Sequence, residues 1–178
     1  MHPVIAIAAL VFMTTAAISD VRQRRITNRL NLTAAATGIT LQIVFGGLDG
    51  ALVAVQGWLV GLGLLFLPFA LGMVGGGDVK FVASVGTFFG WQLTMAGLAV
   101  GVVLGGIVGA VSLARHGRFR SALVGLRADL ICISNGVRPT KLKSSDSVET
   151  VPYGVVLAMG MAGCLAVALF EEVPWVSQ

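Results

Sequence analysis

The chain consists of long apolar runs separated by short polar segments. A transmembrane helix needs about 20 apolar residues to cross a hydrocarbon core of about 30 Å, and these runs are too long and unbroken for barrel strands. The pattern therefore predicts an all-α, polytopic membrane helix bundle of about six transmembrane helices, built as a single domain over residues 1–178. The apolar runs are Pro3–Ser19, Leu32–Phe45, Leu52–Val74, Val79–Gly90, Leu93–Ala114 and Val151–Phe170.

The fourth run, Val79–Gly90, is short for a membrane crossing. At about 1.5 Å per residue it predicts either a short span or a re-entrant segment. The stretch Val79–Ala114 as a whole is nevertheless too long for one ordinary helix. We therefore expect a break at Gly90-Trp91-Gln92, with Trp91 as an interfacial aromatic residue.

The distribution of charge sets the orientation. All 12 Lys and Arg residues lie on one side of the membrane if six spans are present and the N-terminus is outside. The inner segments are then Asp20–Asn31, Gly75–Lys80 and Arg115–Thr150. The only charged residues in the outer segments are acidic, namely Asp49, Glu171 and Glu172. The positive-inside rule thus predicts that both termini are outside, and the first run, which no basic residue precedes, is predicted to be a retained helix.

Residues 114–150 form the longest polar segment, which we interpret as a cytoplasmic loop. Within it, Arg118–Ile133 mixes arginines with leucines and isoleucines, as an amphipathic helix on the membrane surface does. The chain is 56 % hydrophobic and 11 % charged, with a mean hydropathy of +0.92. Its net charge of +4 is therefore interpreted as orientation and contact with anionic lipid, and no nucleic-acid partner is predicted.

The fifth run carries a glycine at every fourth position. Small residues at this spacing let helix backbones approach closely, so we expect this face to pack against another helix. A groove that accepts a substrate helix is the alternative. The glycines are Gly97, Gly101, Gly105 and Gly109.

Two carboxylates, Asp20 and Asp78, fall at the inner ends of apolar runs. Ionisable residues at membrane depth are costly, and they mark functional sites. Two structural alternatives remain open, in which Asp20 caps the arginine-rich loop and Asp78 is the N-cap of the fourth helix. The run Gly75-Gly76-Gly77 before Asp78 favours a functional role, because glycine allows unusual backbone conformations and close approaches.

The sequence predicts neither a metal site nor a bound cofactor. The two cysteines, Cys132 and Cys164, form no CxxC pair, and His2 and His116 are isolated from each other. There is also no GxxxxGK[ST] phosphate-binding pattern and no GxS nucleophile motif. The two aspartates are therefore the main candidates for catalysis.

The segment Gly75–Lys80 resembles the GxGD motif of type IV prepilin peptidases, and Asp20 followed by Ile26-Thr27-Asn28 resembles the family's first aspartate motif. The resemblance extends to Pro152-Tyr153-Gly154 and covers nearly the whole chain. It is greatest to the short peptidases of tight-adherence (Flp pilus) systems. The family usually has proline where this chain has Thr27, which puts the rigidity of that loop in question. The paired-cysteine segment of the bifunctional members is missing, so N-methyl transfer is not expected.

The resemblance implies an aspartic endopeptidase of the bacterial inner membrane, with Asp20 and Asp78 as its catalytic dyad at the cytoplasmic face. Gly75, Gly77 and Lys80 belong to the supporting motif, although a snorkelling interfacial lysine is the favoured interpretation of Lys80. The implied partner is a prepilin with a basic leader and an apolar helix, and the oligomeric state is left open. Three alternatives remain, namely a transporter or channel subunit that uses Asp78 as an ion ligand at a discontinuous helix, a presenilin-like peptidase, and a non-catalytic assembly protein.

Overall fold

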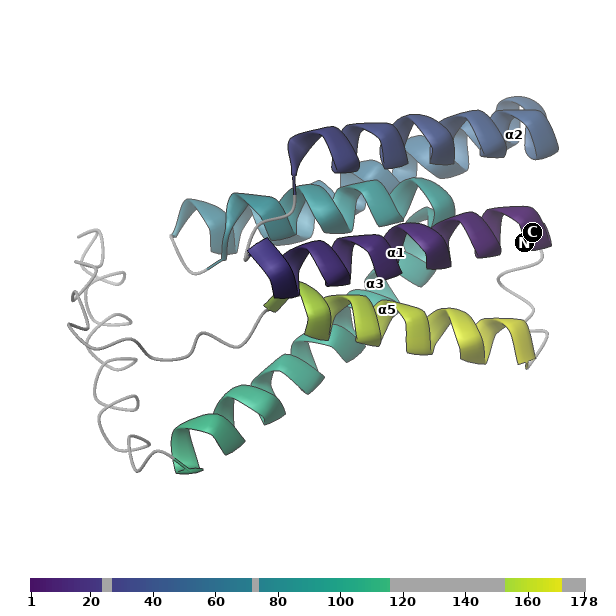
Figure 1. The fold of residues 1–178 in the computed structure, drawn as a ribbon. Helices are drawn as coiled ribbons and strands as arrows, with labels where there is room; N and C mark the ends of the chain where they lie inside the picture. The colour runs from purple at the N-terminus through teal and green to yellow at the C-terminus, as the bar shows by residue number, and fades with distance from the viewer. Residues whose placement is uncertain (24–26, 72–73, 116–152, 171–178) are drawn as a thin grey trace.

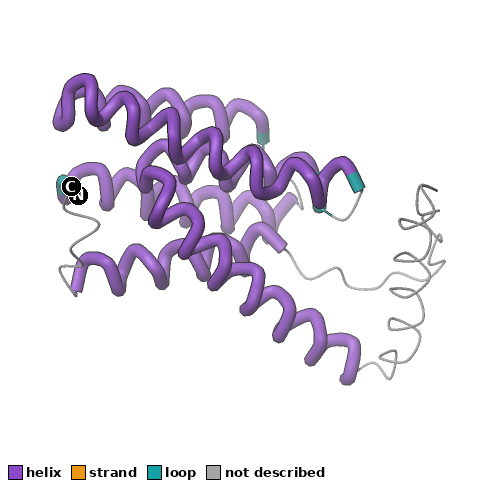
Figure 2. The backbone as a smooth tube through the Cα atoms, turned by 180° about the vertical axis from the view of Figure 1, so that it is seen from behind, coloured by secondary structure: helices purple, strands orange, loops and turns teal. Residues whose placement is uncertain are grey.

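The fold is a bundle of apolar helices. A computed structural model of the chain describes residues 1–23, 27–71, 74–115 and 153–170. They form α1 (Pro3–Gln23), α2 (Asn28–Ala70), α3 (Gly76–Arg115) and α5 (Tyr153–Phe170), and no strand occurs within these ranges. The first three are long and apolar enough to cross a membrane, and α5 is a shorter apolar helix. The helices lie side by side in both views (Figures 1 and 2), which confirms the predicted all-α membrane bundle.

Two glycines divide the longest helices. Gly47 has φ 60° and ψ −137° inside α2, and Gly90 has φ 71° and ψ −178° inside α3. A positive φ is easily reached by glycine and costly for other residues, so each position allows the chain to turn back. The break predicted at Gly90 is confirmed. Together with α1 and α5, the halves of α2 and α3 make six helical segments at the places of the six apolar runs.

The first half of α3 (residues 76–89) forms the centre of the bundle. Its aromatic residues Phe81 and Phe88 are fully buried, and their ring centroids lie 5.6 and 6.4 Å from that of Phe12 on α1. On the other side, a Cβ on Gly57 of α2 would meet the backbone carbonyl of Gly86, and a Cβ on Gly86 would meet that of Gly57. The second half of α2 and the first half of α3 therefore approach each other backbone to backbone, which only small residues allow.

The glycine-rich face of the second half of α3 (residues 91–115) packs against α5. A Cβ on Gly97 would lie 3.1 Å from Met161 Cγ, and one on Gly101 would lie 3.1 Å from Leu157 Cδ2. The predicted helix–helix packing is thus confirmed at Gly97 and Gly101. A Cβ on Gly109 would meet nothing within 4 Å, so close packing does not extend along the whole face.

Some predicted boundaries shift. The first helix continues past Ser19 to Gln23, and α3 begins at Gly76 and not at Val79, so both aspartates lie within helices. The predicted surface helix Arg118–Ile133 lies outside the described residues.

Candidate active site

Three helix termini meet at one end of the bundle (Figure 1). They are the end of α1, the start of α2 and the start of α3, and we call this region the dyad end. The other end carries the N-terminus and the breaks at Gly47 and Gly90, and we call it the break end. Asp20 and Asp78 both belong to the dyad end.

Asp20 is the last residue on the buried face of α1. It follows Phe12 and Ala16 at helical spacing on the stripe that packs into the core, and it is only 8 % exposed. Its Oδ2 atom is buried and has no hydrogen-bond partner among the described residues. The chain therefore places a carboxylate at the end of an otherwise apolar core face.

Asp78 lies in the first turn of α3 and is half-buried. The Gly75 carbonyl accepts hydrogen bonds from the backbone N–H groups of Asp78 at 3.1 Å and Val79 at 3.4 Å, so Gly75 holds the N-cap position. The Asp78 carboxylate accepts a hydrogen bond from the Gly75 backbone N–H, as the third residue of a capping box does. The alternative that Asp78 is itself the N-cap is therefore wrong.

The fold brings the two aspartates together from separate helices. The two carboxylates are close enough for Coulombic repulsion from Asp20 to act on Asp78. Where two carboxylates share a site, ionisation of one disfavours ionisation of the other. Such a pair offers an acid and a base next to each other.

The residues of the supporting motif have different surroundings. A Cβ on Gly75 would lie 3.3 Å from Asp78 Oδ2, whereas one on Gly77 would meet nothing within 4 Å. Neither glycine has a positive φ, so the backbone conformation there is not the unusual one that the sequence suggested. Lys80 is exposed, and its Nζ donates to Asn28 Oδ1 at 2.9 Å. This bond ties the segment after Asp78 to the start of α2.

Thr27 precedes α2 with φ −68° and ψ 141°. This φ is close to the roughly −65° that a proline ring imposes, so threonine adopts here the backbone of the proline that the resemblance leads one to expect. The Thr27 carbonyl accepts the first hydrogen bond of the helix, from the Asn31 N–H at 3.2 Å.

Asn31 is a polar residue that the sequence analysis did not single out. It is 4 % exposed, and neither Oδ1 nor Nδ2 has a partner among the described residues. A signal was present, because Asn31 shares its helical face with Ala34 and Gly38, at the start of an apolar run. A polar side chain on a stripe of small core residues is unusual.

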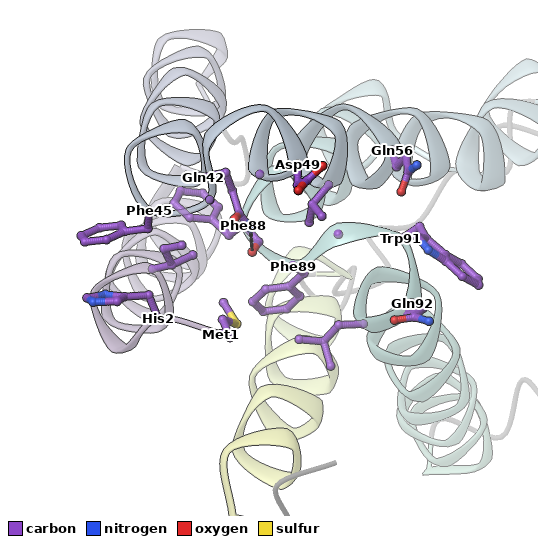
Figure 3. Close-up of a pocket in the computed structure, with 16 residues that line it drawn as sticks. Met1, His2, Gln42, Phe45, Asp49, Gln56, Phe88, Phe89, Trp91 and Gln92 are labelled. Atoms are coloured by element: carbon purple, nitrogen blue, oxygen red, sulfur yellow. Dashed lines mark hydrogen bonds between the residues drawn. The ribbon is translucent and has the colours of Figure 1, made fainter. Parts of the chain in front are cut away.

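A second candidate site lies at the break end, where a pocket of about 470 Å³ opens between the helix breaks (Figure 3). Gln42 Nε2 crosses from α2 to donate to the Phe88 carbonyl at 2.8 Å, and the His2 ring stacks on Phe45 at 3.8 Å. Asp49 is the only acid among the lining residues. The pocket therefore has no pair of carboxylates. Its labelled lining residues are Met1, His2, Gln42, Phe45, Asp49, Gln56, Phe88, Phe89, Trp91 and Gln92.

Among the described residues, no group of three or more His, Cys, Asp or Glu side chains is arranged to hold a metal ion. The chemistry available at the dyad end is that of the two carboxylates and the neighbouring amides.

The fold and the site define a helical membrane protein with two acids at one end of an apolar bundle. The sequence profile of the type IV leader peptidase family matches residues 7–110, which is more than half of the chain and includes both aspartates. The chain therefore belongs to the type IV leader peptidase family and is a membrane peptidase. Comparison with curated proteins gave no match, and neither did comparison with solved structures.

Proposed function

We propose that the protein is an aspartic endopeptidase that removes the leader peptide of type IV prepilins, of the Flp type, with Asp20 and Asp78 as its catalytic dyad. The observation that carries the proposal is that α1 and α3 bring these carboxylates to the same end of the bundle, within range of Coulombic interaction. Family membership supports a leader peptide as substrate. N-methyl transfer is not assigned.

In the proposed reaction the ionised aspartate takes a proton from water, and the resulting hydroxide oxygen attacks the scissile carbonyl carbon. The protonated aspartate donates a hydrogen bond to the carbonyl oxygen and so stabilises the developing negative charge. When the C–N bond breaks, a proton passes to the leaving amine, which becomes the new N-terminus. The proton belongs to the pair, so the acid and base roles are given to the dyad and not to either residue alone.

The placement of charge supports an active site at the cytoplasmic face of the inner membrane. Every Lys or Arg that the structure describes lies in the part of its helix that points toward the dyad end (Figure 1), whereas Asp49 lines the pocket at the break end (Figure 3). The positive-inside rule puts the basic end in the cytoplasm. The six helical segments run alternately toward and away from this end, which supports six crossings. The basic residues are Arg22, Arg29, Lys80 and Arg115.

The open space beside Gly77 supports the proposal that a substrate can approach Asp78. A peptide bond must come within about 3 Å of a catalytic carboxylate to be cleaved, so the residue next to Asp78 has to leave space. A Cβ at Gly77 would project into open space in the first turn of α3. We infer that this space admits the extended leader, and that glycine is required there for access.

The transporter interpretation relies on Gly75–Gly77 as a break within a membrane helix. The positive-φ breaks lie instead at Gly47 and Gly90, at the other end of the bundle. Gly75 is an N-cap and Gly76 begins a regular helix. This arrangement favours the peptidase over an ion site built on a discontinuous helix.

Co-expression with a candidate Flp prepilin tests the function. We expect the prepilin to lose its leader, measured as the mass of its N-terminal fragment, and expect the double variant Asp20→Asn/Asp78→Asn to leave it intact. Processing that is equal with and without the double variant would contradict the proposal and favour a non-catalytic assembly role.

A further inference from the structure

The dyad end contains a buried carboxamide that the proposed chemistry does not use. Asn31 is 4 % exposed, and its side-chain donor and acceptor both lack partners among the described residues. Among the described residues, Asp20 Oδ2 is the other buried side-chain nitrogen or oxygen atom without a hydrogen-bond partner. The unpaired buried polar atoms thus belong to two residues, one on α1 and one on α2, at the same end of the bundle.

Asn31 faces the helix that carries Asp78. Ser84 Oγ on α3 donates to the Asn31 carbonyl oxygen at 2.9 Å. One turn earlier on each helix, Lys80 Nζ donates to Asn28 Oδ1 at 2.9 Å, and Asp78 is two residues before Lys80. These two bonds fix the start of α2 against the start of α3, so that Asn31 lies buried against the helix that carries Asp78.

The neighbouring polar groups do not satisfy the carboxamide. The Ser84 hydroxyl is shared between the carbonyl oxygens of Asn31 and Lys80, and the Lys80 ammonium is bonded to Asn28. Burying an unpaired amide costs roughly 1–3 kcal/mol, and buried polar groups in folded proteins nearly always have partners. A leucine would occupy this apolar position without that penalty. The carboxamide is therefore better explained by a partner that arrives with the substrate.

The chemistry of the side chain defines that partner. A carboxamide offers one acceptor oxygen and an NH₂ donor side by side, which matches the C=O and N–H of an extended peptide. An extended leader that enters the membrane end of the bundle must have its backbone groups satisfied by protein. We propose that Asn31 is a positioning residue that hydrogen-bonds the main chain of the leader next to the scissile bond. This role rests on the proposed peptidase function and names the part of the substrate that is recognised.

Because Asn31 is neutral, it orients the peptide and takes no part in proton transfer. Its action on the backbone is also independent of the leader's side chains. Loss of the carboxamide should therefore weaken binding and alignment of every leader to a similar degree, and leave the pH dependence of turnover unchanged.

The test compares full-length variants reconstituted in lipid, with a purified prepilin as substrate. Asn31→Leu should lower kcat/KM by about 10- to 100-fold, mainly through KM, because two hydrogen bonds of ordinary strength are lost. Its melting temperature should equal or exceed that of the wild type, and the shape of its pH profile should not change. Asn31→Thr, which keeps a hydroxyl donor and acceptor, should recover part of the loss. Thr87→Val, a buried isosteric change on the neighbouring face of α3, is the matched control and should leave the kinetics unaltered.

The outcomes separate the two proposals. A wild-type protein that cleaves no prepilin would contradict the proposed function itself. A wild type that cleaves, together with wild-type KM and kcat per folded molecule in Asn31→Leu and Asn31→Thr, would overturn only the role of Asn31 and show it to be structural. If Asn31→Leu does not fold, the KM of Asn31→Thr decides, because a structural residue would lower the amount of folded protein without raising KM.

Discussion

The two ends of the bundle differ in charge and in backbone regularity. The dyad end holds Asp20, Asp78 and the basic residues Arg22, Arg29 and Lys80, and its glycines Gly75–Gly77 have no positive φ. The break end holds both positive-φ glycines, a pocket of amides and aromatic rings, and a single acid, Asp49. Charge and irregular backbone are thus placed at opposite ends of the same helices.

This difference between the two ends explains how the fold holds two acids in place. Each aspartate is attached to a regular helix, so its position is set by rigid elements and by the packing of Phe12 against Phe81 and Phe88. The reversals that need a positive-φ glycine inside a helix, at Gly47 and Gly90, occur at the end where no dyad has to be held in place. A change at the dyad end should therefore affect catalysis, whereas a change at the break end should affect stability.

The largest expected effect is the loss of either carboxylate. Asp20→Asn and Asp78→Asn should each reduce cleavage by about 10³-fold or more, because an amide serves as neither the acid nor the base of the pair. Both variants should still fold and insert, since neither carboxylate makes a contact on which the core depends. The measurement is single-turnover cleavage of a prepilin by purified protein. Near-normal turnover in either variant would make that aspartate structural.

The next effect concerns access to Asp78. Gly77→Val should lower kcat/KM by about 10- to 100-fold with little change in protein level, because its side chain would fill the open space in the first turn of α3. Gly106→Val is the control, since a Cβ there also meets nothing within 4 Å and the residue lies in the other half of α3. Equal activity in the two variants would show that Gly77 is an ordinary helix residue.

At the break end the expected effect is on stability alone. Gly90→Ala should destabilise the fold by about 1–3 kcal/mol, because alanine is disfavoured at a positive φ and its Cβ would lie 2.8 Å from Val53 Cγ1. Gly63→Ala, at a helical position with open space, is the control and should be neutral or slightly stabilising. Thermal unfolding and activity per folded molecule measure the two effects. A large loss of specific activity in Gly90→Ala would contradict the division between the ends.

The smallest effect is expected at Lys80. Lys80→Met keeps the apolar stem and removes the bond to Asn28, so activity should fall only about two- to fivefold. Asn28→Ala should give a similar decrease, and the double variant should be no worse than either single one. Additive losses would show that Lys80 acts on something other than Asn28.

Much of this fold could be predicted because its strongest determinants are local. Apolar runs and the glycine break after Phe89 are visible in the sequence, as is the rarity of an acid such as Asp78 beside apolar spans. Other features depend on contacts between distant segments. Among 24 glycines, the sequence does not distinguish Gly47 from Gly75 or Gly77, because a positive φ is selected by tertiary packing. The burial of Asn31 likewise depends on α3 lying against α2.

The central claim, that Asp20 and Asp78 act as one unit, is tested most directly by following carboxyl protonation with difference infrared spectroscopy over a pH series. In the wild type we expect two separated protonation steps for the pair. In Asp20→Asn and in Asp78→Asn we expect a single step, at a pH that differs from both wild-type steps, because the Coulombic interaction has been removed. If the remaining aspartate titrates in each variant at the same pH as in the wild type, the two carboxylates are independent and the dyad mechanism is wrong.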